Sequence, residues 1–391
     1  MQLLSGVVQN YDWGDTSYIA NLLGIPAGKP QAEYWLGAHR SAPSRFVEST
    51  TDSLDAFIDA SPQQLLGEAN NKRYGQLPFL LKVLAAGHPL SIQSHPSKTQ
   101  AEDGFKREND AGVAVDSPTR VYRDNNHKPE LICALTPFEA KVGFRSLAQT
   151  VQLFNELPSG VELDAVRERL SSTTVEAEAL VEVLQYPLSL ENPAPLVRAV
   201  VAGAQKLVDV KSTFSREFLW TGKINTFFPD DIGVVVALLL NHVSLQPHQA
   251  VYLGAGNLHC YLQGVGVELM ANSDNVVRGG LTTKHIDIKE LLHVVSAEPV
   301  QPEIDQAEGA VHTFASGAPE FALTRVLDPD HEPFEVDGPE ILLVTDGEIQ
   351  VTNLSNKVHN LGKGSAVFVA ADDQTYRLNG KGVCWRACVG S

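Results

Sequence analysis

Short runs of alternating apolar and polar residues, separated by Gly, Pro, Asn and Asp, set the strongest limit on the fold of this 391-residue chain. They dominate residues 1–145, where "RFVES", "PFLLKVLAA" and "LSIQSHP" are examples, and they return after about residue 240. Alternation over about four to eight residues is typical of β-strands, and frequent turns indicate a sandwich or a barrel. The sequence therefore predicts a mainly β protein.

Residues 146–240 interrupt this pattern. Apolar residues recur there at three- and four-residue spacing, so that Leu196, Val200 and Ala204, for example, lie along one helical face. Such spacing is typical of amphipathic helices that pack against one another. We therefore expect a helical insertion between strand-rich regions.

The C-terminal region reads as a second β unit. Asp346-Gly347 in "EILLVTDGEIQVTN" predicts a hairpin turn, and the polar stretch near 300–311 is typical of a linker. His312, His331 and His359 are isolated, without a Glu or Gln at strand spacing. We expect a first β domain from residues 1–145 and 241–305, the helical insertion at 146–240, and a C-terminal β domain at 306–391 that holds no metal.

Composition excludes several classes of partner. The formal net charge is −17, from 30 basic and 47 acidic residues, so the surface repels nucleic acid and anionic lipid. No segment reaches the roughly 18 apolar residues of a membrane span, and the longest candidate, "IGVVVALLLNHVSL", is expected to be a buried helix. The N-terminus does not resemble a signal peptide. The four scattered cysteines favour a reducing cytoplasm. An anionic substrate would need a local basic pocket.

Three distant segments combine polar residues with apolar strands. In "LSIQSHP" the residues Ser91, Gln93 and His95 share one face, opposite Leu90 and Ile92. "NHKPELICAL" places Lys128 and Glu130 together, and "GNLHCYLQG" supplies His259. Burying such groups without partners costs several kcal/mol each, a cost that a divalent cation removes by taking them as ligands.

The candidate ligands are the amide oxygen of Gln93, the ring nitrogens of His95 and His259, and a carboxylate oxygen of Glu130. Two nitrogens and two oxygens suit zinc or another divalent first-row ion, although glutamine is an unusual zinc ligand. With one anionic ligand, the site keeps net positive charge and acts as a Lewis acid. The alternative is that both histidines are ordinary hydrogen-bonded residues and Glu130 a surface charge.

Basic residues accompany this constellation. Lys82 lies inside an apolar strand, where a lysine is costly without an anionic partner, so a structural ion pair is the alternative to a binding role. Arg278 and Lys284 lie in a Gly-containing polar loop, "NVVRGGLTTK". The aromatic–glycine clusters "NYDWG" and "AEYWLGAH" line a pocket or, as we favour, pack in the core.

The ordered segments "YDWG", "AEYWLGAH", "PFLLKVL", "QSHP", "NHKPE", "GNLHCYLQG" and "MANSDNVVRGGLTTKHID" resemble those of the type I phosphomannose isomerase (mannose-6-phosphate isomerase) family. The resemblance extends from the first dozen residues to about residue 290. It implies cupin-type jelly-roll units, one zinc ion per chain, and interconversion of mannose 6-phosphate and fructose 6-phosphate.

The resemblance also implies residue roles. Gln93, His95, Glu130 and His259 would be the zinc ligands, and Arg278 would lie in the active site, with Lys128, Glu268, Asp274 and Lys284 nearby. The reaction moves a proton between two sugar carbons through a cis-enediol, which requires a base and stabilisation of negative oxygen. Metal, Arg278 and Lys128 would supply the stabilisation; Lys82, Lys284 and Ser91 would bind the phosphate, a function that Arg278 would share.

Several alternatives stay open in the sequence. The base is Glu268, Asp274, a hydroxide on the metal or a group near His95, and Arg278 serves either the phosphate or the enediolate. Zinc contacts the sugar directly or through water, and the chain is a monomer or a weak homo-oligomer. Two other functions compete: a non-catalytic sugar-phosphate sensor, and an iron-dependent cupin oxygenase, which usually uses more histidines.

Overall fold

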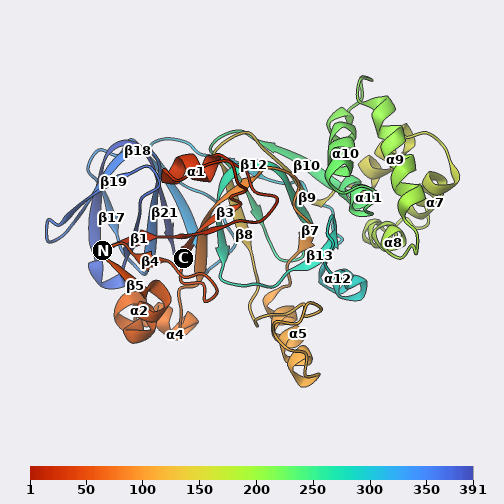
Figure 1. Cartoon of the computed structure of the whole chain (residues 1–391). Coiled ribbons are helices and arrows are strands. Elements are labelled where there is room, and N and C mark those ends of the chain that lie inside the picture. Colours follow the sequence, from red (N-terminus) through yellow and green to blue (C-terminus); the bar gives the residue numbers. More distant parts are fainter. Residues whose placement is uncertain (391) are drawn as a thin grey trace.

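A computed structural model describes residues 1–390, and two large antiparallel sheets dominate it (Figure 1). The first sheet has 11 strands among these residues, with a main path in the order β14-β11-β8-β12-β6-β3-β2. Its strands are β2 (Val7–Gln9), β3 (Glu33–Gly37), β6 (Phe79–Ala86), β7 (Ile92–Ser94), β8 (Glu130–Ala134), β9 (Phe138–Phe144), β10 (Leu240–Leu245), β11 (Gln249–Leu253), β12 (His259–Ala271), β13 (Val277–Gly280) and β14 (Ile304–Gln306).

Strand β12 links two parts of this sheet. Its first half pairs with β7 and β9, and its second half pairs with β6 and β8. The change falls at Gly264, where φ is +124° and an added Cβ would lie 2.6 Å from the Pro137 carbonyl oxygen. Only glycine adopts that backbone readily, so this position turns the strand from one group of partners to the other.

The second sheet has 10 strands in the described part of the chain, in the order β15-β16-β21-β18-β20-β1-β4-β5 with β17 and β19 attached. They are β1 (Gln2–Ser5), β4 (Arg45–Phe46), β5 (Ser49–Ser53), β15 (Val311–Thr313), β16 (Ala322–Leu327), β17 (Glu332–Glu335), β18 (Glu340–Asn353), β19 (Val358–Gly362), β20 (Ala366–Val369) and β21 (Thr375–Cys388).

Three N-terminal strands therefore belong to the C-terminal sheet. β1 pairs with β20, and β4 and β5 continue from β1. Conversely, β14 pairs with β11 of the first sheet. The sequence placed residues 1–145 in one domain and 306–391 in another, and it did not anticipate this exchange of strands. The division into domains stays a prediction.

The helices lie in three regions. The helical insertion holds α6 (Leu147–Glu156), α7 (Val161–Leu170), α8 (Glu176–Leu188), α9 (Ala194–Leu207), α10 (Ser215–Phe227), α11 (Gly233–Val236) and the 3-10 turn η1 (Ala237–Leu239). Helices α7 to α11 stand at one end of the molecule, away from the chain termini (Figure 1). The others are α1 (Tyr18–Leu23), α2 (Leu54–Ala60), α3 (Pro62–Leu66), α4 (Glu68–Tyr74), α5 (Lys98–Asp110), α12 (Ile288–Val294) and the turn η2 (Ala371–Asp373).

Alternation along β6 separates the core from the site. Leu81 and Val83 belong to a buried cluster that also includes Ile341 and Trp385, so the two sheets pack against each other through this face. Lys82 points to the opposite face, which lines a cavity. The period of two thus places one row of residues in the core and the other at the site.

Two local expectations were wrong. Asp346-Gly347 is no hairpin turn: β18 continues through it, with a register shift between Val344 and Asp346. The segment after Gly233, expected to be one buried helix, is a short helix followed by strand β10. No helix within residues 1–390 is long and apolar enough to cross a membrane.

Candidate functional site

Strand pairing brings the distant polar segments together. Gln93 on β7 is the register partner of His259 on β12 and of Arg278 on β13. Directly opposed residues on antiparallel strands place their side chains on the same face, with Cβ atoms about 5 Å apart. The backbone thus gathers three of the predicted site residues into one cross-strand row.

His95, Glu130 and His259 form a compact buried group. Each residue is 1% exposed, and their ligand atoms all lie within 4.8 Å of one another. The Nε2 atom of His95 is 3.4 Å from one carboxylate oxygen of Glu130, and the Nε2 atom of His259 is 3.3 Å from the other. Three of the four predicted ligands therefore converge.

The imidazole rings of His95 and His259 are oriented so that their Nε2 atoms are available to bind a metal. His95 Nδ1 lies 2.8 Å from the carbonyl oxygen of Asn275, and His259 Nδ1 lies 2.9 Å from that of Asn257. A carbonyl only accepts, so each Nδ1 carries the proton and each Nε2 holds a lone pair. Both Nε2 atoms and Glu130 Oε2 are buried without a hydrogen-bond partner, as expected of atoms that bind a divalent cation.

The surrounding charges keep these groups in ligand form. Burial raises the pKa of Glu130, but Lys128, whose Nζ is 2.7 Å away, and His95 lower that pKa well below its ordinary value. Burial and Lys128 lower the pKa of His95 to about 4, so the ring is neutral at pH 7. A neutral imidazole and an ionised carboxylate are the forms that bind metal.

A large cavity lies next to this group, and Glu130 forms part of its wall. It has a volume of about 1210 Å³, and its wall includes every predicted catalytic and substrate-binding residue: Lys82, Ser91, Lys128, Glu268, Asp274, Arg278 and Lys284. Gln93 also lines the cavity, next to the metal-ligand group in the strand register. Its role as the fourth ligand stays a prediction.

Lys82 lies between two buried carboxylates. Its Nζ is 3.0 Å from Glu268 and 3.2 Å from Glu33, whose other oxygen accepts a hydrogen bond from the Trp35 indole. Burial by itself would lower the pKa of Lys82, yet Glu268 and Glu33 raise it, and the ammonium stays charged. These contacts favour the structural ion pair, and contact between Lys82 and substrate stays a prediction.

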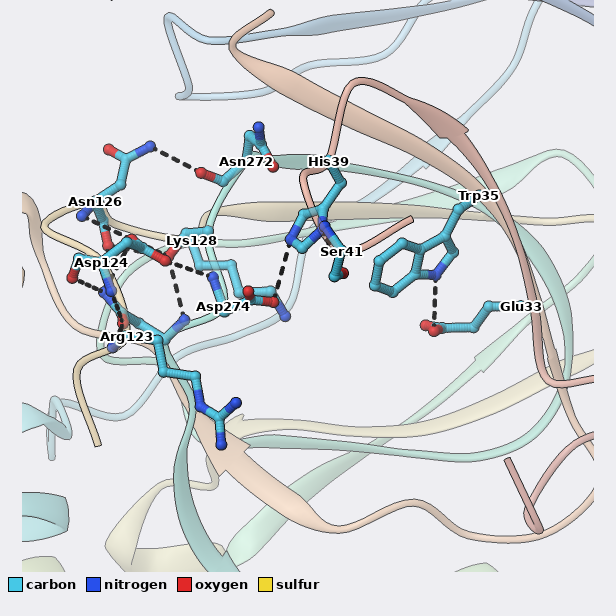
Figure 2. A network of polar contacts seen from close by, with 12 residues as sticks. Glu33, Trp35, His39, Ser41, Arg123, Asp124, Asn126, Lys128, Asn272 and Asp274 are labelled. Carbon is cyan, nitrogen blue, oxygen red and sulfur yellow. Dashed lines mark hydrogen bonds and ion pairs between the residues drawn. The ribbon is translucent and has the colours of Figure 1, made fainter. Parts of the chain in front are cut away.

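The two candidate bases differ in their surroundings. Burial, together with Glu130 and Glu33, raises the pKa of Glu268 despite the opposing effect of Lys82. Asp274 is half exposed, and its ion pair with His39 Nε2 at 3.2 Å lowers its pKa (Figure 2). Because a base with a depressed pKa accepts a proton poorly, the structure favours Glu268.

Asp124 fixes the turn that carries Asp274. Its carboxylate accepts hydrogen bonds from the backbone of Asp274 and Asn126 and from the hydroxyl of Ser273 (Figure 2). The side chain of Asn275 in turn accepts from the backbone N–H of Arg123. One network thus holds the loop before Lys128 against the loop before Arg278.

Three cations, Arg123, Arg278 and Lys284, also belong to the wall of the cavity. Burial and the nearby Arg123 lower the pKa of Arg278, and burial, Arg278 and Arg123 lower that of Lys284. The guanidinium of Arg123 extends away from the Asp124 network (Figure 2), and Arg123 also lines the cavity. This cluster is the basic pocket that an anionic substrate requires in so acidic a protein.

Comparison with known proteins agrees with this geometry. Residues 1–147 match the model of the phosphomannose isomerase type I catalytic domain. Mannose-6-phosphate isomerase of Escherichia coli is 37% identical over 98% of each chain. Mannose-6-phosphate isomerase 1 of Arabidopsis thaliana is 32% identical over 94% of this chain and 89% of its own. The chain belongs to the type I phosphomannose isomerase family.

Solved structures of the phosphomannose isomerase family share the fold. A mannose 6-phosphate isomerase from Salmonella typhimurium, bound to its substrate fructose 6-phosphate and to zinc, has a TM-score of 0.90 at 35% identity over the whole of both chains. A zinc-bound mannose 6-phosphate isomerase has a TM-score of 0.89 at 34% identity. The mainly β, cupin-type fold with a helical insertion is confirmed, and neither sheet path closes into a barrel.

Sequence reasoning missed several residues of this phosphomannose isomerase site. Glu33 and Trp35, in a segment favoured for the core, line the cavity, although Trp35 also packs in a buried cluster with Leu80 and Met270 as expected. Their neighbours Tyr34 and Leu36 pack inside. The alternation in "AEYWLGAH" was the available signal. Arg123 lies in an irregular polar loop whose sequence carries no comparable signal.

Proposed function

We propose that the chain catalyses the reversible conversion of mannose 6-phosphate to fructose 6-phosphate, with one zinc ion bound by His95, Glu130, His259 and Gln93. The single observation that carries this function is the group of three buried, unpartnered ligand atoms beside a cavity. The wall of that cavity includes Glu130 and the cations Arg123, Arg278 and Lys284. The names of the relatives support the substrate, and the zinc-bound relatives support the metal.

Zinc, when bound, polarises the oxygens of the open-chain sugar as a Lewis acid. The protein's own groups do the rest. Lys128 holds the Glu130 carboxylate ionised, and it lies beside the position where negative charge develops on the substrate. Fixed cations in a largely buried cavity stabilise such charge more strongly than water does.

Glu268 is the proposed base. It would take a proton from one sugar carbon and return it to the neighbouring carbon, so that a cis-enediol forms and then collapses. Its raised pKa brings it closer to neutral pH, where a base accepts and returns a proton most effectively. Its buried position, at 2% exposure, protects the proton from exchange with bulk water.

The phosphate would bind to Arg123, Arg278 and Lys284, with Ser91 as a neutral donor. Besides burial, Arg123 lowers the pKa of Arg278, and Arg278 and Arg123 lower the pKa of Lys284, so these positive charges repel one another. A doubly charged phosphate relieves this repulsion, and arginine matches its oxygens as a planar fork. We therefore assign Arg278 to the phosphate and leave Lys128 beside the enediol.

A coupled assay that detects fructose 6-phosphate tests the function. We expect saturable turnover of mannose 6-phosphate by the zinc-loaded protein and not by Glu268→Gln at matched zinc content. Saturable binding without turnover in the wild type would establish the sensor instead. Metal analysis that finds iron rather than zinc would favour the oxygenase. A cytoplasmic location and a monomeric or weakly associating state remain predictions.

A further inference from the structure

The helical insertion reaches the mouth of the active-site cavity. The segment between α10 and α11 supplies Phe228 to the cavity wall. Its neighbour Phe227 stacks on His88, which also lines the cavity, with ring centroids 4.7 Å apart and planes 17° apart. The insertion is therefore in direct contact with the site.

Asp231, in the same segment, holds the loop that follows β13. Its Oδ1 accepts hydrogen bonds from the backbone N–H of Leu281 at 2.9 Å and from that of Gly233 at 2.7 Å. Its Oδ2 accepts from the backbone N–H of Thr282 at 3.2 Å. One carboxylate of the insertion thus satisfies two successive donors of the loop.

The loop has a backbone that needs such support. Leu281 is buried with φ of +54°, a left-handed conformation that costs a leucine free energy unless its surroundings enforce it. An added Cβ on Gly280 would lie 2.5 Å from the Gly233 Cα, and one on Gly233 would lie 2.5 Å from the Leu281 nitrogen. The two segments therefore touch backbone to backbone.

Strand β13 and the loop after it carry two of the three cations proposed to bind phosphate. Arg278 lies three residues before Leu281 and Lys284 lies three residues after it. Both line the cavity, and no negatively charged side chain in the described residues forms an ion pair with either. Their positions consequently depend on the backbone between them.

We propose that Asp231 is a positioning residue, through which the helical insertion fixes Arg278 and Lys284 for phosphate binding. Asp231 does not touch the substrate; it acts through the Leu281 and Thr282 amides. This inference rests on the proposed function for the identity of the substrate. The effect of Asp231 on the positions of Arg278 and Lys284 would be the same for any phosphate ligand.

The test compares Asp231→Ala and Asp231→Asn with the matched control Asp230→Asn. Asp230, one residue away, accepts two hydrogen bonds of 2.9 and 2.6 Å from Arg198 of α9, and within the described residues it has no hydrogen bond or ion pair with the loop. Its φ of +61° is one that asparagine tolerates. Each zinc-loaded variant is assayed for KM, kcat and the inhibition constant of inorganic phosphate.

We expect Asp231→Ala to raise both KM and the phosphate inhibition constant by roughly 10- to 100-fold, because a small displacement of a binding group has effects of that order. Asp231→Asn should raise them less, since its amide oxygen still serves Leu281 and Gly233. Zinc content should equal that of the control. If the alanine variant does not fold, the asparagine variant decides, with a rise of at least about threefold expected.

Values within about twofold of Asp230→Asn for both Asp231 variants would overturn the inference, as would a loss of thermal stability without a rise in KM. If the wild type fails to turn over mannose 6-phosphate, the proposed function fails. Inorganic phosphate binding, measured by calorimetry on the same variants, then still tests the inference alone.

Discussion

Replacement of Lys82 by methionine tests the electrostatics of the site most directly. Lys82 is 5% exposed, and its ammonium lies within 3.2 Å of the carboxylates of Glu33 and Glu268, residues that are 6% and 2% exposed. Methionine preserves the length and most of the packing but removes the charge. Two buried carboxylates then lack a counter-ion, and this arrangement is strongly unfavourable.

The expected magnitude follows from this burial. Removing one partner of a buried ion pair costs about 3–5 kcal/mol, so Lys82→Met should destabilise the fold by at least that range. At about 2 °C per kcal/mol for a large domain, the melting temperature should fall by about 6 °C or more. The control is Lys106→Met, because Lys106 pairs with Asp110 on the exposed surface of α5, where solvent screening leaves such pairs little effect on stability.

The loss should depend on pH with a definite sign. The pKa of Glu268 is already raised in the folded protein, and without Lys82 it rises further. The folded state then binds more protons than the unfolded state above pH ~4.3, so the stability of the variant improves relative to wild type as pH falls from 7 to 5. Thermal unfolding of zinc-loaded proteins at both pH values measures this.

A melting temperature for Lys82→Met equal to that of Lys106→Met would refute the reasoning. So would a deficit that is the same at pH 5 and pH 7. In either case Lys82 would not be required to neutralise the two carboxylates, and its predicted binding role would gain support.

Three other outcomes follow from the site. EDTA should abolish turnover and added zinc should restore it. The His259→Ala variant should hold no zinc at stoichiometric concentration, and metal analysis that finds full zinc occupancy in this variant would exclude His259 as a ligand. Arg123→Ala should raise KM by roughly tenfold and leave kcat within about threefold, while Arg73→Ala, which alters an exposed arginine stacked on Tyr74, should match the wild type. Raising the ionic strength from about 0.05 to about 0.5 M shortens the Debye length from ~14 to ~4 Å and should therefore raise KM. A KM that does not change with salt would contradict charge attraction between substrate and site.

The site shows where local sequence patterns suffice. Glu130 faces the cavity while Leu131 and Cys133 join the core, as the alternation along β8 predicts. His95 and His259 meet Glu130 as expected. These outcomes were predictable because successive side chains of any strand point to opposite faces. The residues that share a face can therefore be read from the local sequence.

The pairing of strands that lie far apart in the chain could not be predicted from the sequence. Nothing in residues 2–53 indicates that β1, β4 and β5 join the C-terminal sheet, because an edge of one sheet accepts any strand of suitable register. Asp346-Gly347 has the composition of a hairpin, but both residues pair with β21, and β18 continues beyond them to pair with β19 from Glu348 onward. Tertiary pairing therefore overrode a local turn preference.

By itself, the sequence determined which regions are strand-rich and which are helical, because this depends on periodicity. It also determined the three convergent ligand side chains and the need for a basic pocket, because these depend on desolvation and charge. Only the tertiary structure decided that Arg123 joins the cations, that Lys82 bridges two glutamates, and that Asp231 supports the Arg278 loop. Each of those contacts joins segments from different parts of the chain. Their free energy depends on distances between backbones, and no short stretch of sequence encodes such a distance.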